Sequence, residues 1–198
     1  MTEFLRSLFF ALQVLIVSLA LPLAATVLTP SWYLQNCEWH GRCAEITGDT
    51  AEQHIGNLRD YFLQRDDLRG FWSDKERRHL AEVRVIYQHI TLVSALALVA
   101  VALCLYWQPN WVRKATVVAF VILVVLALGG LSAFGFFWRD VLHPLLFDNR
   151  DWLTNPRDMT WYITPRVFFR NSMIVIVSGA ALIMGLVYAL SWYRDRRA

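Results

Sequence analysis

Four long stretches that contain no Asp, Glu, Lys or Arg constrain the fold of this chain more than any other feature. They cover residues 7–37, 85–112, 115–138 and 171–193. Each holds an apolar run close to the ~20 residues with which a helix crosses a hydrocarbon core ~30 Å thick. A segment inside a bilayer must satisfy its own backbone polar groups, and a helix does so. The sequence therefore predicts an all-α membrane protein with four transmembrane helices.

The composition excludes other classes of fold. Of the 198 residues, 57% are hydrophobic and 18% are charged, whereas soluble domains have roughly 45–50% and 25%. Disordered chains are poor in apolar residues, and the strands of a membrane barrel alternate apolar and polar residues, which these runs do not. The first run is longer than the apolar part of a usual secretory signal peptide, so we expect it to be retained as a helix.

The basic residues predict the orientation in the membrane. Six of the 19 lie in about 20 positions at the two chain ends and in one short turn, and the other 13 are spread over about 89 positions. Because cytoplasmic loops are enriched in Lys and Arg, we expect both termini and that turn to be cytoplasmic. The predicted segments are 1–28 (tail and first transmembrane helix), 29–87 (first outer segment), 88–107 (second helix), 108–114 (turn), 115–137 (third helix), 138–170 (second outer segment) and 171–198 (fourth helix and tail).

The two outer segments hold nearly all the polar chemistry, and together they are too small for a large core of their own. We expect them to form a small extracytoplasmic cap. Three prolines in residues 138–170 predict irregular or short-stranded structure there. About half of the 28 aromatic residues lie in the two outer segments. This enrichment indicates a cap that meets lipid tails as well as water.

Two helices are predicted in the first outer segment. Residues 50–64 have apolar side chains at helical spacing, which indicates an amphipathic helix. Ser73, followed three residues later by Glu76, is a capping box. A helix should start there and continue into the second span. It places Glu76, His79 and Glu82 three residues apart along one side.

The three cysteines point to a disulfide rather than a metal. Cys37 and Cys43 are predicted to lie outside, where disulfides persist, and Cys104 lies inside a span. Cys37, His40 and Cys43 are also spaced as metal ligands, but a structural zinc site uses four ligands and no fourth is evident, so we expect no metal. A quinone-linked thiol oxidoreductase needs a Cys-x-x-Cys pair, which this sequence lacks.

The histidines are the remaining candidates for catalysis. The sequence has no nucleophile-elbow serine, no phosphate-binding glycine loop and no His-Glu-x-x-His motif. His79 and His143 should both lie at the junction of cap and membrane, where a lipid ester bond would lie, and histidine is the commonest general acid or base. The alternative is that both are interfacial polar anchors. We treat His40, His54 and His89 as structural.

Two stretches resemble the lipoprotein intramolecular transacylase family. They are residues 54–87 and 142–169, and the order of the helices agrees as well. The first family motif, roughly Glu-x-x-His-Met-x-Asp-Val, corresponds here to Glu76, His79, Leu80, Glu82 and Val83. The second corresponds to Leu142, His143, Leu146, Phe147, Trp152, Asp158, Pro165, Phe168 and Phe169. The departures from the family pattern are Leu80 for Met, Glu82 for Asp, Leu142 for Phe, and Pro144 after the histidine.

The resemblance implies a reaction in a bacterial cytoplasmic membrane, with the active site on the extracytoplasmic side. An acyl chain moves from the sn-2 oxygen of a diacylglyceryl group to the α-amino group of a lipoprotein's N-terminal cysteine. It implies catalysis by His79 and His143, no cofactor, and a diacylglyceryl lipoprotein and membrane lipids as partners. No nucleic acid is expected.

Other residues fit supporting roles in that chemistry. Glu76 or Glu82 can orient His79, as the carboxylate of a triad does. Oxyanion donors are proposed among Arg84, Arg139 and Tyr162. The residues expected to bind substrate are Phe71, Trp72, Phe147, Trp152, Asp158, Trp161 and Phe169. Two alternatives stay open: a different lipid acyltransferase or hydrolase that uses the same histidines, and a non-enzymatic membrane scaffold.

Overall fold

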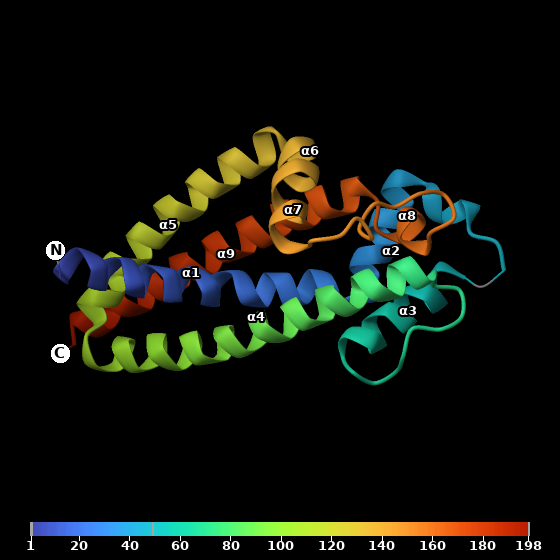
Figure 1. The fold of residues 1–198 in the computed structure, drawn as a ribbon. Coiled ribbons are helices and arrows are strands. Elements are labelled where there is room, and N and C mark those ends of the chain that lie inside the picture. The colour runs from blue at the N-terminus through green and yellow to red at the C-terminus, as the bar shows by residue number, and fades with distance from the viewer. Residues whose placement is uncertain (1, 49, 198) are drawn as a thin grey trace. The chain divides into compact units, whose positions relative to one another are not determined.

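The computed structural model describes residues 2–48 and 50–197, and that part of the chain holds helices and loops but no β-strand. Four of its helices are long and apolar enough to cross a membrane (Figure 1). They are α1 (Thr2–Leu28), α4 (Asp74–Trp107), α5 (Pro109–Ser132) and α9 (Arg166–Asp195). The prediction of an all-α protein with four transmembrane helices is confirmed.

The chain divides into two compact units. One comprises residues up to 23, residues 88–132 and those from 174 onward, and we call it the membrane unit. The other comprises residues 24–87 and 133–173, and we call it the cap unit. Its limits lie near those of the two predicted outer segments. Helix α4 gives residues 74–87 to the cap unit and residues 88–107 to the membrane unit.

The core of the membrane unit includes several small side chains. Ala11, Ala115, Ala119 and Ala180 are all almost completely buried in it, and small residues let helix backbones approach closely in a membrane. At Gly179 a Cβ would lie 2.7 Å from Pro22 Cγ, so only glycine fits there. Large side chains on the outer surface, such as Leu126 and Leu182, are exposed, as expected of a surface that faces lipid.

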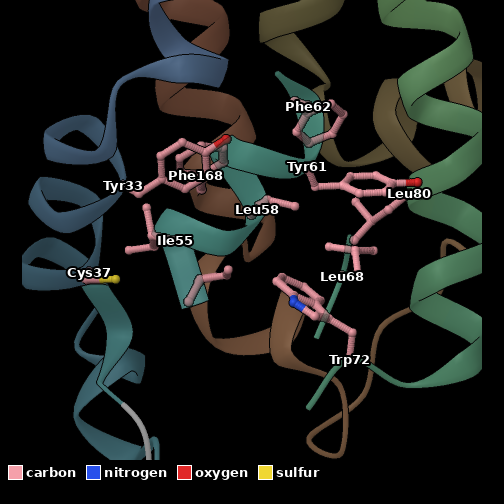
Figure 2. Close-up of a cluster of buried hydrophobic side chains, with 11 residues drawn as sticks. Tyr33, Cys37, Ile55, Leu58, Tyr61, Phe62, Leu68, Trp72, Leu80 and Phe168 are labelled. Carbon is pink, nitrogen blue, oxygen red and sulfur yellow. The ribbon is translucent and has the colours of Figure 1, made fainter. Parts of the chain in front are cut away.

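The core of the cap unit is built on α2 (Pro30–His40), α3 (Ala51–Phe62) and α8 (Met159–Ile163). Figure 2 shows side chains of α2 and α3, including Tyr33 and Ile55, gathered with Trp72 and Phe168. Helix α2 begins at a proline and is capped after His40 by Gly41, whose φ of 74° suits glycine.

Both helices predicted in the first outer segment are present. Thr50 caps α3 through a reciprocal capping box with Gln53. At the start of α4, Glu76 Oε2 accepts from the backbone N–H of Ser73, whose Oγ accepts from the Glu76 N–H. The capping box predicted from the sequence therefore forms. The sequence did not predict α2, nor the short 3₁₀ helix η1 (Arg42–Glu45) that follows it.

The expectation of irregular or short-stranded structure in the second outer segment is only partly right. Its described residues contain no strand, and the loop 147–158 connects short helices. The segment contains most of the π-helix η2 (Phe137–Leu142), then α7 (His143–Leu146) and α8, and it is preceded by α6 (Phe134–Phe136). The prolines were misleading, because Pro144 lies in the first turn of α7, where its missing N–H is not needed.

Candidate functional site

The cap unit brings His79 and His143 together. The centroids of the two imidazole rings are 6.2 Å apart, and the ring planes are inclined by 33°. His79 lies in the second turn of α4, and His143 is the first residue of α7, 64 residues further along the chain. The two residues that the sequence singles out for acid–base chemistry therefore share one site.

His143 is held by the π-helix that precedes it. In η2 the carbonyl of Trp138 accepts the backbone N–H of His143 and also contacts Nδ1 of its ring, 2.6 Å away. A carbonyl oxygen can only accept, so Nδ1 carries the hydrogen. In the neutral ring the lone pair is then on Nε2. The contact with the Trp138 carbonyl therefore fixes the tautomer of His143. π-helical turns also occur often at functional sites.

Aromatic rings surround the two histidines. The ring of His143 lies 4.6 Å from those of both Trp138 and Trp152. Phe147 lies 4.7 Å from the ring of His79 and 5.7 Å from that of His143. Phe169 stacks on Trp138 at 4.3 Å. Three residues of the predicted substrate pocket, Phe147, Trp152 and Phe169, are therefore in or beside the site.

A carboxylate faces His79. Oε2 of Glu82 lies 3.9 Å from Nδ1 of His79. Neither atom has a hydrogen-bond partner within the described residues, although both are buried. The other oxygen of Glu82 accepts from Nδ2 of Asn149 at 2.7 Å. The carboxylate of Glu82 thus faces the His79 ring without a hydrogen bond to it.

Both histidines are held in the neutral form. Residues 74–84 carry seven charged side chains, so we place the membrane-spanning part of α4 at 88–107, and His79 precedes it. Burial lowers the pKa of His79 to about 4, and the neighbouring His143 adds to this shift. Burial also lowers the pKa of His143, although its bond to Trp138 opposes the change. At neutral pH both rings can therefore accept a proton.

Glu76 and Asp158 join the two outer segments instead of contacting a histidine. Oε1 of Glu76 accepts from the N–H and the hydroxyl of Thr160, at 2.7 and 2.9 Å. Asp158 pairs with Lys75 at 2.6 Å and accepts from Ser73. Both oxygens of Glu76 are engaged in this way, so of the two carboxylates expected to orient His79 it is Glu82 that faces the ring.

The three predicted oxyanion donors are engaged away from the histidines. Arg84 lies over the ring of Tyr61, Arg139 pairs with its neighbour Asp140, and the hydroxyl of Tyr162 donates to the carbonyl of Pro156. The two arginine side chains contact partners close to their own positions instead of the histidines. The spacing of residues in the sequence does not show which partner an arginine will contact.

The remaining predicted aromatic residues belong to other parts of the cap. Trp72 is 2% exposed and donates from its indole nitrogen to Asn57, as part of the hydrophobic core. Phe71 packs on His54. The ring of Trp161 lies under the guanidinium of Arg42, at 4.1 Å. No contact with His79 or His143 is recorded for these three aromatic residues among the described residues.

Cys37 and Cys43 are joined in a disulfide. His40 lies beside them, and the three potential ligand atoms are within 4.8 Å of one another. Since zinc binds cysteine as a thiolate, sulfur atoms bonded to each other cannot hold the metal. The pair therefore closes the turn after α2, next to α8.

Two residues of the site were missed from the sequence. Trp138 acts through its backbone carbonyl, which carries no sequence signal, and the π-helix has none either. Asn149 is one of several polar residues in a loop, and its residue type alone does not single it out. The pattern Asp-Asn-Arg-Asp at residues 148–151 is a turn signal, and it would have marked Asn149 as a residue whose side chain bonds the backbone.

Comparison with known proteins gives a family. The family model described as lipoprotein intramolecular transacylase Lit matches residues 7–169. The matched range contains both histidines, Glu82 and Asn149. No curated protein sequence matches the chain significantly.

Solved structures share the fold. The membrane integral lipoprotein intramolecular transacylase Lit from Bacillus cereus is 20% identical and has a TM-score of 0.69, over 100% of this chain and 99% of that one. A variant of the Bacillus cereus protein with one histidine changed to alanine is 18% identical and has a TM-score of 0.76, over 100% and 96%. A histidine-to-arginine variant is 18% identical, with a TM-score of 0.74, over 100% and 95%. At this level of identity the likeness shows the fold alone.

Proposed function

The chain belongs to the lipoprotein intramolecular transacylase family, and we propose on that basis that it transfers the sn-2 acyl chain of a diacylglyceryl group to the α-amino group of the lipoprotein's N-terminal cysteine. The product is an N-acylated lyso-form lipoprotein. The observation that carries the proposal is the pair of histidines, His143 buried and His79 partly buried, whose ring centroids lie 6.2 Å apart. The proposed transfer is an aminolysis, in which an ester and an amine give an amide and an alcohol, and it needs no cofactor.

The two histidines match the two protons that the reaction must move. An α-amino group has a pKa of about 8, so most of it arrives as the ammonium. Its nitrogen loses one proton before it can attack and a second as the C–N bond forms. The glyceryl oxygen needs one proton when its C–O bond breaks, and the other goes to water.

The surroundings of the two histidines support a separate role for each, one as the base during attack and the other as the proton donor to the leaving oxygen. We assign His79 as the base during attack, because Glu82, 3.9 Å away, can stabilise the imidazolium that forms. His143 takes the first proton of the ammonium on Nε2 and returns it to the leaving glyceryl oxygen. Its Nδ1–H stays on the Trp138 carbonyl throughout. No covalent enzyme intermediate is needed.

The aromatic rings favour transfer over hydrolysis. Trp138, Phe147 and Trp152 cover the histidines, and a site that excludes water protects an ester from the competing nucleophile. Holding the amine next to its own acyl chain is an entropic task, and a confined pocket can supply much of the rate in this way.

We place the reaction on the extracytoplasmic side of a bacterial cytoplasmic membrane. The enrichment of basic residues supports cytoplasmic termini, which puts the cap unit outside. A disulfide in the cap unit fits an oxidising compartment.

The test is mass spectrometry of a lipoprotein's N-terminal peptide from cells with and without the protein. We expect conversion to the N-acylated lyso-form only with the parent protein, and its loss in the separate variants His79→Ala and His143→Ala. His89→Ala is the matched control, because His89 is an exposed histidine of the same helix α4. Full conversion by both catalytic variants would overturn the assignment. Release of free fatty acid would instead indicate a hydrolase.

A further inference from the structure

Asn149 contacts the surroundings of both histidines. Its Nδ2 donates to Oε1 of Glu82 at 2.7 Å, and the second oxygen of Glu82 faces His79. Its backbone carbonyl accepts from the indole nitrogen of Trp152 at 2.9 Å, and the Trp152 ring lies 4.6 Å from that of His143. Asn149 is therefore hydrogen-bonded to one neighbour of His79 and to one neighbour of His143.

The amide of Asn149 can make its contacts in only one orientation. Its Oδ1 accepts from the backbone N–H of Asp151 at 2.9 Å, and its Nδ2 donates to Glu82. A backbone N–H can only donate and a carboxylate can only accept. Asparagine, with an accepting carbonyl oxygen and a donating NH₂ group, suits both partners. Aspartate would keep the bond to the Asp151 N–H but place a second carboxylate against Glu82.

We propose that Asn149 is a positioning residue, which holds Glu82 against His79 and Trp152 against His143. The inference rests on the proposed function of the two histidines. The Asn149 bond fixes one oxygen of Glu82, so the carboxylate plane is set and the other oxygen remains on the His79 side. Without that bond Glu82, whose side chain is 42% exposed, would turn toward water.

A second tie holds the same turn to α4. Arg78 binds Asp151 through two hydrogen bonds, at 2.8 and 3.3 Å. Arg78 and Glu82 are four residues apart and so lie on one side of the helix. The turn can therefore stay in place when the Asn149–Glu82 bond alone is lost, and this allows the bond to be tested separately from the loop.

The test is a double-mutant cycle on Asn149 and Glu82, with turnover measured on a diacylglyceryl lipopeptide at saturating concentration. Asn149→Asp keeps the turn, repels Glu82 and should lower turnover about ten- to hundredfold. Glu82→Gln, bonded to an unchanged Asn149, presents an amide nitrogen to His79 and should also lower turnover. In the double variant, the new amide at position 82 donates to the new carboxylate at position 149 and keeps its oxygen on the His79 side. The double variant should therefore be more active than either single variant.

The matched control is Asn155→Asp. Asn155 also accepts from a backbone N–H two residues on, in the same outer segment. Within the part of the chain that the structure describes, it has no hydrogen bond to Glu82 or to a histidine, so Asn155→Asp should retain the parent's turnover. If Asn149→Asp does not fold, Asn149→Ala replaces it and must lose more activity than Asn155→Ala.

A double variant that is no more active than Asn149→Asp would overturn the inference, and so would an Asn149→Asp variant that keeps the parent's turnover. His79→Ala and His143→Ala are measured alongside. If those two variants remain active, the proposed function fails. If they are inactive while the cycle shows no recovery, only the role of Asn149 fails.

Discussion

At the scale of single residues, the site depends on histidines that stay uncharged. Burial lowers the pKa of both rings, because the charged form of a buried imidazole loses its hydration. Each ring then needs a neighbouring acceptor that stabilises the imidazolium formed when the ring takes up a proton. His143 has the Trp138 carbonyl, and His79 has the carboxylate of Glu82.

This predicts how activity depends on pH. Only the neutral rings can take protons from the ammonium, so kcat/KM should fall when acid protonates the free enzyme. Because the pKa of His79 is lowered to about 4 and that of His143 is lowered as well, the fall should occur below pH ~6.5, the ordinary value for histidine.

The measurement is kcat/KM from pH 4.5 to 7.5 on a lipopeptide substrate. The substrate amine titrates near pH ~8, outside this interval. A parent protein that has already lost half of its kcat/KM at pH 6.5 would contradict the neutral pair.

At the scale of the elements, helices that depend on local sequence patterns could be predicted, and a helix that depends on a contact distant in the sequence could not. Helix α3 and the start of α4 follow from capping boxes, in which a side chain bonds the backbone three residues away. Helix α8 depends instead on Glu76, which accepts from Thr160 across 84 residues. No local pattern contains that bond, so the second outer segment could not be predicted from its prolines.

The long-range role of Glu76 predicts a large effect on stability. Glu76 is 3% exposed, and Glu76→Ala leaves the buried donors of Thr160 and the partly buried donors of Ser73 without this acceptor. We expect a loss of about 3 kcal/mol in the free energy of unfolding. Faster hydrogen exchange in α8 should accompany it. Glu52→Ala, which removes an exposed acidic residue from the first turn of α3, should change the free energy of unfolding by less than ~0.5 kcal/mol. Equal losses in both variants would contradict the account.

The disulfide also acts at this scale. It closes a loop between residues six apart, and in the chain-entropy account such a loop contributes about 2 kcal/mol. Cys37→Ser with Cys43→Ser should therefore lower the thermal midpoint of the cap unit, measured in detergent. Cys104→Ser, which removes the free thiol, is the control. An unchanged midpoint in the double serine variant would show that the bond does not stabilise the fold.

At the scale of the whole molecule, the four transmembrane helices could be predicted because a charge-free apolar run of about 20 residues is what a helix needs to cross the hydrocarbon core of a bilayer. The site was predictable only in part. The two histidines and Glu82 stood out by residue type, but Trp138 acts through a backbone carbonyl and Asn149 through a turn. Arg84 and Arg139, expected as oxyanion donors, contact an aromatic and an acidic neighbour instead of the histidines, and the sequence gives no sign of these partners.

The proposed orientation can be tested in intact cells. Single cysteines are introduced at Glu52 and at Arg196, which are both exposed, in a Cys104→Ser background that keeps the disulfide. A membrane-impermeant maleimide should label the cysteine at position 52 and should reach position 196 only after the cells are opened. The reverse pattern would place the cap unit in the cytoplasm and contradict the proposed compartment.

The central claim is that an acyl chain moves from oxygen to nitrogen within one lipoprotein molecule. The most direct measurement uses the purified protein and a diacylglyceryl lipopeptide with a deuterated sn-2 chain, mixed with an unlabelled lipopeptide of different peptide sequence. We predict that the deuterium appears as an amide on the α-nitrogen of the labelled peptide and never on the other peptide. Deuterated free fatty acid, label that remains as an ester, or label on the second peptide would contradict the account.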